Sequence, residues 1–104
     1  MDEIRVLLCC GAGMSSGFLA QKTRQAAKKR KMKASVDARA ESEVGGYLGS
    51  IDILMVGPHY ASRLGDFEQM AAPYNIPVMI IPQDIYAGLN GEALLDLALE
   101  NIKK

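Results

Sequence analysis

The sequence has no tryptophan, two cysteines, one histidine and four prolines among its 104 residues. The two cysteines are adjacent and cannot form a disulfide framework, so we expect a reducing compartment, the cytoplasm. The charged side chains balance to a formal net charge of zero, and no nucleic-acid partner is expected. No apolar run approaches the roughly 20 residues of a membrane span, and the start of the chain does not have the pattern of a signal peptide. Any work at a membrane would therefore need docking onto a membrane partner.

The length of the chain predicts one domain over residues 1–104. A chain of this size buries roughly 60–65% of its unfolded surface, which suffices for a core without cross-links. Apolar residues make up 49% of the sequence, but they form no obvious apolar stripe for a partner copy. We therefore expect a monomer.

Four apolar segments predict β-strands, and they alternate with helical segments. The predicted strands are Ile4–Cys9, Ala34–Ala40, Ile51–Val56 and Pro77–Pro82. The predicted helices run from Gly17 or Phe18 to Lys31, Ser42–Leu48, Tyr60–Ala72, and Gly91 or Glu92 to Lys103. The segment Gln83–Gly88 is expected to be a loop. This alternation is typical of an α/β fold with a four-stranded parallel sheet, strand order 2-1-3-4, and helices on both faces.

In such Rossmann-like sheets, ligands bind beyond the carboxyl ends of the strands, where the strand order reverses. Here that point lies between the first and third strands. Three segments are expected to converge there: Cys10–Ser16, Gly57–Tyr60 and Gln83–Tyr86.

The first of these segments contains the candidate nucleophile. Small residues let backbone N–H groups approach one centre closely, and a helix N-terminus then favours an anion. A cysteine in this setting has a lowered pKa and is nucleophilic near neutral pH. We assign the nucleophile to Cys10, against the alternative of a buried apolar thiol, and expect Cys9 to pack inward. The predicted phosphate-binding residues are Gly11, Ala12, Gly13, Met14, Ser15, Ser16 and Gly17.

The same residues also have plainer interpretations. Gly11 and Gly13 could be turn residues, and Ser15 and Ser16 are expected to cap the helix in either case. The loop is neither a Walker A loop nor a G-x-G-x-x-G loop. It has the layout of a tyrosine-phosphatase loop, except that Ser16 stands where that loop has arginine. An arginine there would stabilise the transferring group and favour turnover, so its absence favours a phosphoryl carrier over a hydrolase.

The sequence resembles the IIB component of the sugar phosphotransferase system, lactose/cellobiose class. The resemblance begins with the segment Leu8–Leu19 and continues through Asp52–Pro58, Pro77-Val78, Tyr86-Ala87-Gly88 and the final helix. The resemblance covers essentially the whole chain. It implies a fold similar to low-molecular-weight tyrosine phosphatase. It also implies a loop cysteine, here Cys10, that takes a phosphoryl group from phosphohistidine of a IIA component. That group would then pass to a sugar held by a membrane IIC component, in a phosphocysteine–sugar phosphotransferase reaction. No cofactor is expected, and no metal, because the sequence has no cluster of His, Cys and Asp ligands.

Two alternatives remain beside this hypothesis: an enzyme of the low-molecular-weight phosphatase or arsenate-reductase type, and a non-catalytic regulatory module. The sequence does not identify the sugar. It departs from the family pattern at Cys9 and at His59, where relatives often have an amide side chain.

Other polar and apolar residues have two interpretations each. His59, Tyr60 and Tyr86 are possible rim residues, although His59 could be an exposed loop residue and Tyr86 could cap the core. Met14 and Phe18 could form an apolar docking rim. The basic stretch Lys22–Lys33 is either the solvated face of a helix or a surface for an acidic partner.

Overall fold

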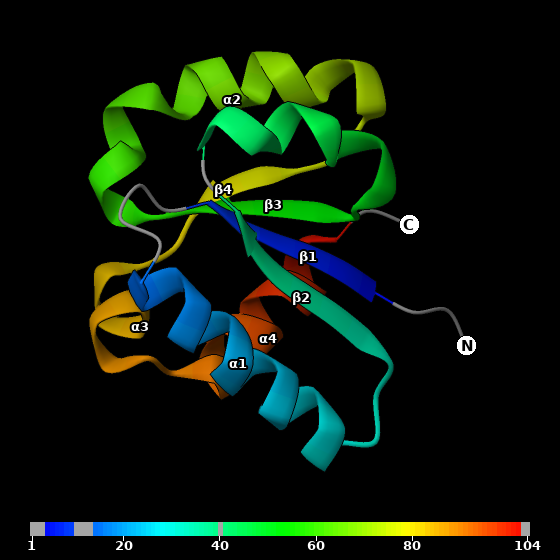
Figure 1. Ribbon diagram of the computed structural model, residues 1–104, viewed down its shortest axis with the longest axis vertical. Helices are drawn as coiled ribbons and strands as arrows, with labels where there is room; N and C mark the ends of the chain where they lie inside the picture. Colours follow the sequence, from blue (N-terminus) through cyan, green and yellow to red (C-terminus); the bar gives the residue numbers. More distant parts are fainter. Residues whose placement is uncertain (1–3, 10–13, 40, 103–104) are drawn as a thin grey trace.

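A parallel sheet lies between two layers of helices (Figure 1). The computed structural model describes residues 4–9, 14–39 and 41–102. The strands are β1 (Ile4–Cys9), β2 (Ala34–Arg39), β3 (Ile53–Val56) and β4 (Val78–Ile80). Their order is β2-β1-β3-β4, and every neighbouring pair is parallel. The predicted topology is therefore confirmed.

The two central strands explain why this sheet needs helices on both faces. The residues of β3, and the last four of β1, are buried. Because side chains alternate along a strand, successive residues enter different cores. Val6, Leu8, Ile53 and Met55 belong to one core, whereas Leu7, Cys9, Leu54 and Val56 belong to the other.

The first helical layer consists of α1 (Met14–Lys29), α3 (Gln83–Gly88) and α4 (Gly91–Asn101) (Figure 1). The inward face of α1 is narrow, as its small residues predict. Its buried residues are Leu19, Ala20, Thr23, Ala26 and Ala27. Leu94, Leu95 and Ala98 of α4 are buried, whereas Leu99 is 37% exposed.

The other face of the sheet is covered by a series of short helices: η1 (Glu41–Gly46), η2 (Leu48–Ser50), η3 (Pro58–Arg63), α2 (Leu64–Ala71) and η4 (Ala72–Tyr74) (Figure 1). Their buried side chains pack on the second core. They include Val44, Leu48, Phe67 and Ala71.

Two of the predicted segments differ in kind. The expected α-helix over Ser42–Leu48 is the 3₁₀ helix η1 followed by η2, and Ser42 lies inside η1 and not at its start. The adjacent Gly45 and Gly46 disfavour an α-helix, and a short segment between strands can close with tighter turns. The expected loop over Gln83–Gly88 is helix α3, which begins after Pro82 and has Asp84 in its first turn, where the helix dipole favours an acid.

Several boundaries also differ. Helix α1 begins at Met14, three residues before the predicted start at Gly17, because small polar residues do not stop a helix. The third helix is divided into η3 and α2, and η3 begins already at Pro58. Strand β4 is shorter than the predicted Pro77–Pro82, and it is half-buried because it is an edge strand.

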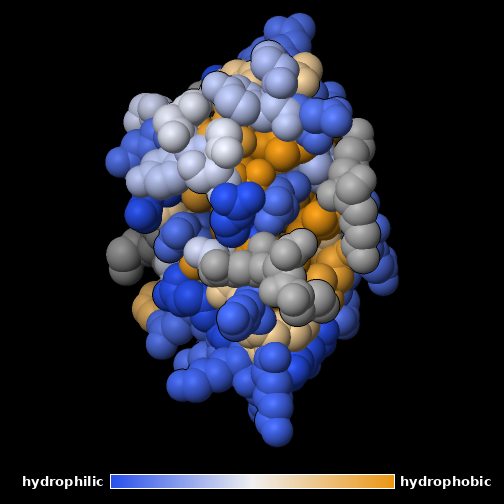
Figure 2. Space-filling model, turned by 90° about the vertical axis from the view of Figure 1, so that its right-hand side faces the viewer, coloured by the Kyte–Doolittle hydropathy of each residue, from blue (hydrophilic) through white to orange (hydrophobic). Residues whose placement is uncertain are grey.

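The amino ends of the strands lie on the right in Figure 1. Figure 2 views this side and shows apolar side chains between polar ones. The carboxyl ends of the strands face the opposite way, on the left in Figure 1, where α3 and the start of α1 lie.

Candidate functional site

The carboxyl edge of the sheet brings together the starts of α1, η3 and α3 (Figure 1). These elements follow β1, β3 and β4 respectively. In an open parallel sheet this is the edge at which ligands bind. The elements that contain Met14–Ser16, Gly57–Tyr60 and Gln83–Tyr86 therefore lie at this edge, whereas the rest of the first predicted segment, Cys10–Gly13, is outside the described residues.

The candidate nucleophile lies outside the described residues. This holds for Cys10 and for Gly11, Ala12 and Gly13. Met14, Ser15 and Ser16 belong to the first turn of α1, although their side chains are outside the description. The prediction that Ser15 or Ser16 is the N-cap is wrong, because α1 begins one residue before Ser15.

Cys9 packs inward, as predicted. Its side chain is fully buried in the core beneath α2, together with Leu7 and Val56. Its carbonyl oxygen accepts a hydrogen bond of 2.9 Å from the backbone N–H of Gly57. This bond joins the end of β1 to the residue that precedes η3, and so fixes the position of the start of η3 relative to the end of β1.

Tyr60 is held at this edge by backbone and ring contacts. Its N–H donates to the carbonyl oxygen of Gly57 at 2.9 Å. Its ring meets Phe67 edge-to-face at 5.8 Å between centroids, and the guanidinium of Arg63 lies 5.9 Å from the Tyr60 ring centre. Tyr60 thus lies at the predicted rim as a partly buried residue. His59 is in η3, and its side chain is outside the description.

Tyr86 lies on α3 and not in a loop. Its partly buried ring packs against the core that contains Leu19 and Ile81, which supports the core-capping interpretation. Its N–H donates to the carbonyl oxygen of Pro82 at 3.0 Å. A contact between its hydroxyl and a phosphate stays a prediction.

The outer face of α1 near its start is exposed. Phe18 is 53% exposed, which is high for a large apolar side chain and agrees with the predicted rim position. A Cβ added to Gly17 would meet nothing within 4 Å. The space beside Gly17 is therefore open. Use of this surface for docking stays a prediction.

Sequence reasoning missed Arg39 as a residue of this edge. Arg39 ends β2, and its Cα pairs with that of Cys9 across the sheet. Its Nε donates to the hydroxyl oxygen of Tyr47 at 2.8 Å, and this bond is the main reason that the pKa of Arg39 is raised. The available signal was positional: in the order 2-1-3-4, the last residue of the second strand lies beside the last residue of the first.

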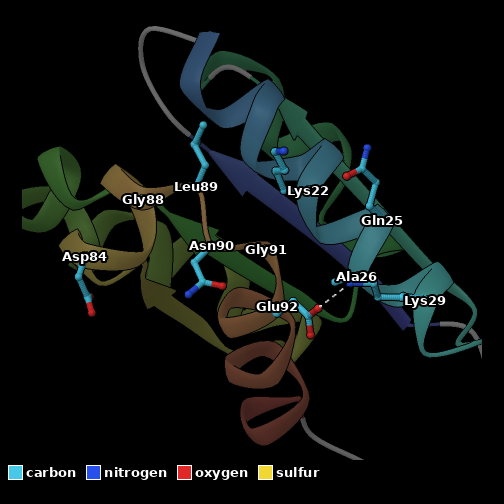
Figure 3. A pocket seen from close by; sticks show the side chains of 10 residues that line it. All are labelled: Lys22, Gln25, Ala26, Lys29, Asp84, Gly88, Leu89, Asn90, Gly91 and Glu92. Carbon is cyan, nitrogen blue, oxygen red and sulfur yellow. Dashed lines mark ion pairs between the residues drawn. The ribbon is translucent and has the colours of Figure 1, made fainter.

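A groove of about 470 Å³ lies between α1 and the segment that joins α3 to α4 (Figure 3). Its lining contains apolar residues as well as charged and polar ones, which are Lys22, Gln25 and Lys29 of α1, and Asp84, Asn90 and Glu92 opposite. Lys29 and Glu92 form an ion pair of 3.7 Å across it (Figure 3).

The basic stretch Lys22–Lys33 is partly neutralised by α4. The guanidinium of Arg30 lies 2.7 Å from Asp96 and 3.1 Å from Glu92. These carboxylates, Asp96 first, raise the pKa of Arg30. Some basic side chains of this stretch therefore form ion pairs with carboxylates of α4, within the chain itself.

No helix in the described part of the chain has both the length and the apolar character that crossing a membrane requires.

Comparisons with known proteins identify the family of this chain. Residues 5–97 match the family described as "PTS system, Lactose/Cellobiose specific IIB subunit". The chain belongs to this family. A relative of the IIB family, the galactose-specific EIIB component of Lactococcus lactis subsp. cremoris (strain MG1363), is 26% identical over 107 residues, with 98% of each chain covered.

Another relative carries its IIB part within a longer protein. The lactose-specific EIICB component of Lacticaseibacillus casei is 26% identical over 103 residues, which cover 97% of this chain but 18% of that protein. Among solved structures, the cellobiose-specific IIB component from Borrelia burgdorferi superposes with a TM-score of 0.81 at 31% identity, covering 97% of this chain and 93% of that one. The fold described above is thus the IIB fold, and the chain is a sugar-specific IIB component of lactose/cellobiose type.

Proposed function

We propose that this chain is a phosphoryl carrier that forms a phosphocysteine at Cys10. In the first half-reaction, the Cys10 thiolate attacks the phosphorus of a phosphohistidine on a IIA component. The P–N bond breaks, a P–S bond forms, and the imidazole is released. In the second, a hydroxyl oxygen of a sugar held by a membrane IIC component attacks that phosphorus, the P–S bond breaks, and the thiolate returns. The hydroxyl proton leaves to a base or to water.

One observation carries the proposal beyond family membership. Strand β1 ends at Cys9 and α1 begins at Met14, so Cys10 is the first residue of the short connection between a buried strand and a helix of 16 residues. The first turn of α1 contains no acidic side chain. A helix N-terminus without acids favours an anion and a thiolate nearby. The expected phosphate ligands are the backbone N–H groups of Gly11–Gly17 and the hydroxyls of Ser15 and Ser16.

This reaction would take place in the cytoplasm, because a nucleophilic thiol has to stay reduced and the cytoplasm is a reducing compartment. Two partners in turn would use one edge, so each contact is transient and modest in area. The transported sugar belongs to the lactose, cellobiose or β-glucoside type. Residues 1–104 would act as one phosphotransferase domain.

The test is incubation with a phosphorylated IIA protein of this class, followed by peptide mass spectrometry at neutral pH. Phosphate is expected on Cys10 in the wild type and in Cys9→Ala, and on neither cysteine in Cys10→Ser. Absence of phosphate on Cys10 in the wild type would contradict the proposal. Turnover of an aryl phosphate by the chain alone would instead support a phosphatase. Normal sugar uptake by a Cys10→Ser strain would support a regulatory module.

A further inference from the structure

Strand β2 has an outer edge, the side of the strand that does not face β1. It is the first strand in the sheet order, so β1 is its one neighbouring strand among the described residues. The N–H of Ile4 donates to the carbonyl oxygen of Lys33, and Ile4 is in register with Ala34. Because the backbone groups of successive residues point to alternate sides of a strand, the carbonyl groups of Ala34, Val36 and Ala38 point outward. An edge of this kind is a template for pairing with a strand of another chain.

Two arginine side chains bond to the outward carbonyl groups of β2. Nη1 of Arg24 donates to the carbonyl oxygen of Val36. Nη1 of Arg39 donates to the carbonyl oxygen of Ala38 at 3.0 Å. Arg24 belongs to α1, whereas Arg39 is the last residue of β2 itself. Two side chains from different elements therefore occupy acceptors on the same outer edge.

The two arginines are anchored on opposite faces of the sheet. Helix α1 buries Leu19 in the core to which Val36 also belongs. Arg39 is held from the other face, because its Nε donates to the hydroxyl oxygen of Tyr47 at 2.8 Å and its guanidinium carbon lies 5.1 Å from the centre of the Tyr47 ring. Tyr47 packs against the second core. The outer edge of β2 is thus covered from both helical layers.

The other edge of the sheet is protected by different means. Strand β4 has three residues, with Pro77 directly before it and Pro82 shortly after it. A short edge strand next to prolines is a poor template for pairing. Strand β2 has six residues and contains neither proline nor glycine. The longer edge is therefore the one on which the arginines lie.

We propose that Arg24 and Arg39 are edge caps that prevent β2 from pairing with β2 of a second copy of this chain. Identical edge strands related by a two-fold axis pair antiparallel. An axis at Val36 would place Val36 opposite Val36 of the other copy, and Ala34 opposite Ala38. The carbonyl oxygens of Val36 and Ala38 would then have to accept from the other copy, and these are the atoms that the arginines occupy. The inference goes beyond the proposed function and involves no phosphoryl group.

The test is the oligomeric state of the full chain, measured by sedimentation velocity over a range of protein concentrations. The wild type should be a monomer. Arg24→Ala/Arg39→Ala should dimerise with an association constant at least about 10-fold higher, because charge-assisted hydrogen bonds no longer compete with pairing. The matched control is Lys22→Ala/Lys28→Ala, which removes two exposed cations of α1 and makes the same change in net charge. This control should stay monomeric.

Hydrogen exchange and an edge proline locate the interface of the dimer. In the double arginine variant, the amides of Val36 and Ala38 should exchange more slowly once the dimer forms. Adding Ala34→Pro removes an outward N–H at the first residue of β2 and should weaken the dimer. A dimer that Ala34→Pro does not weaken would overturn the pairing at β2.

A purely structural role of the two arginines would lower the melting temperature of the double variant and leave it monomeric. A folded double variant that stays as monomeric as the wild type would therefore overturn the proposal, as would a wild type that pairs through β2. Equal association of the lysine control would also overturn it, because the loss of charge alone would then suffice. If circular dichroism shows that the double variant is unfolded, Arg24→Ala decides, because it retains the bond between Arg39 and Tyr47. A raised association constant in Arg24→Ala would support the proposal, and an unchanged one would overturn it.

Discussion

Gly91, at the start of α4, lies against the backbone of Lys22 in α1. A Cβ atom at position 91 would come within 2.3 Å of the Lys22 carbonyl carbon and 2.5 Å of the Thr23 nitrogen. The absence of a side chain therefore allows α4 to approach α1 closely, over the buried Thr23. This contact fixes the layer of helices that supports the carboxyl edge.

Gly91→Ala should destabilise the protein by about 1–3 kcal/mol, because its methyl group meets backbone atoms that cannot rotate away. The measurement is the free energy of unfolding by urea. The matched control is Gly65→Ala in α2, where an added Cβ meets nothing within 4 Å. At position 65 the better helix propensity of alanine should raise the free energy of unfolding by about 0.4–1 kcal/mol. Equal effects of the two substitutions would contradict the close approach of α1 and α4.

Phe67→Leu should loosen η3, because the buried Phe67 ring holds Tyr60 edge-to-face. The expected cost is about 1–2 kcal/mol, from the lost aromatic pair and imperfect repacking. Hydrogen exchange should quicken at the Tyr60 amide, which donates to Gly57. Tyr74→Leu, at an aromatic residue that is 49% exposed, should change stability by less than about 0.5 kcal/mol. Unchanged exchange at Tyr60 would mean that Phe67 does not anchor this segment.

Cys9 should be unreactive in the folded protein, because its side chain is fully buried. In a Cys10→Ala variant, which retains Cys9 alone, iodoacetamide should label the native chain on the order of 100-fold more slowly than the urea-unfolded chain, as expected for a group exposed only by unfolding. A Cys9→Ala variant should be labelled at Cys10 under native conditions. Rapid native labelling of Cys9 would contradict its inward packing.

The sheet could be predicted from the sequence because its central strands are buried on both faces. A continuous apolar segment such as Ile53–Val56 has no helical periodicity, and right-handed crossovers then leave few topologies. The position of Cys9 followed from the same argument, since the last residue of a central strand lies in a core.

The short helices could not be predicted in the same way. Helix α3 is six residues long, too short for a periodic apolar pattern, and the Pro82 before it and Gly88 at its end read as loop residues. The 3₁₀ helices η1 and η2 depend on tertiary packing of Val44 and Leu48, not on local propensity. The bond between the side chain of Arg39 and the Tyr47 hydroxyl could not be predicted, because no local pattern associates two residues that are eight positions apart across the end of a strand.

At the end of α1, replacing Lys31 by glycine is expected to stabilise the protein. Lys31 follows the helix with a left-handed backbone, φ 59°, and the N–H of the next residue, Met32, donates to Ala27 at 2.9 Å. A side chain is strained in this conformation, so Lys31→Gly should stabilise by about 0.5–1 kcal/mol. The matched control is Lys33→Gly, also at an exposed lysine but without a positive φ, which should destabilise by several tenths of a kcal/mol as backbone entropy is lost. Both are measured by urea unfolding, and a loss of stability in Lys31→Gly would contradict the left-handed helix end.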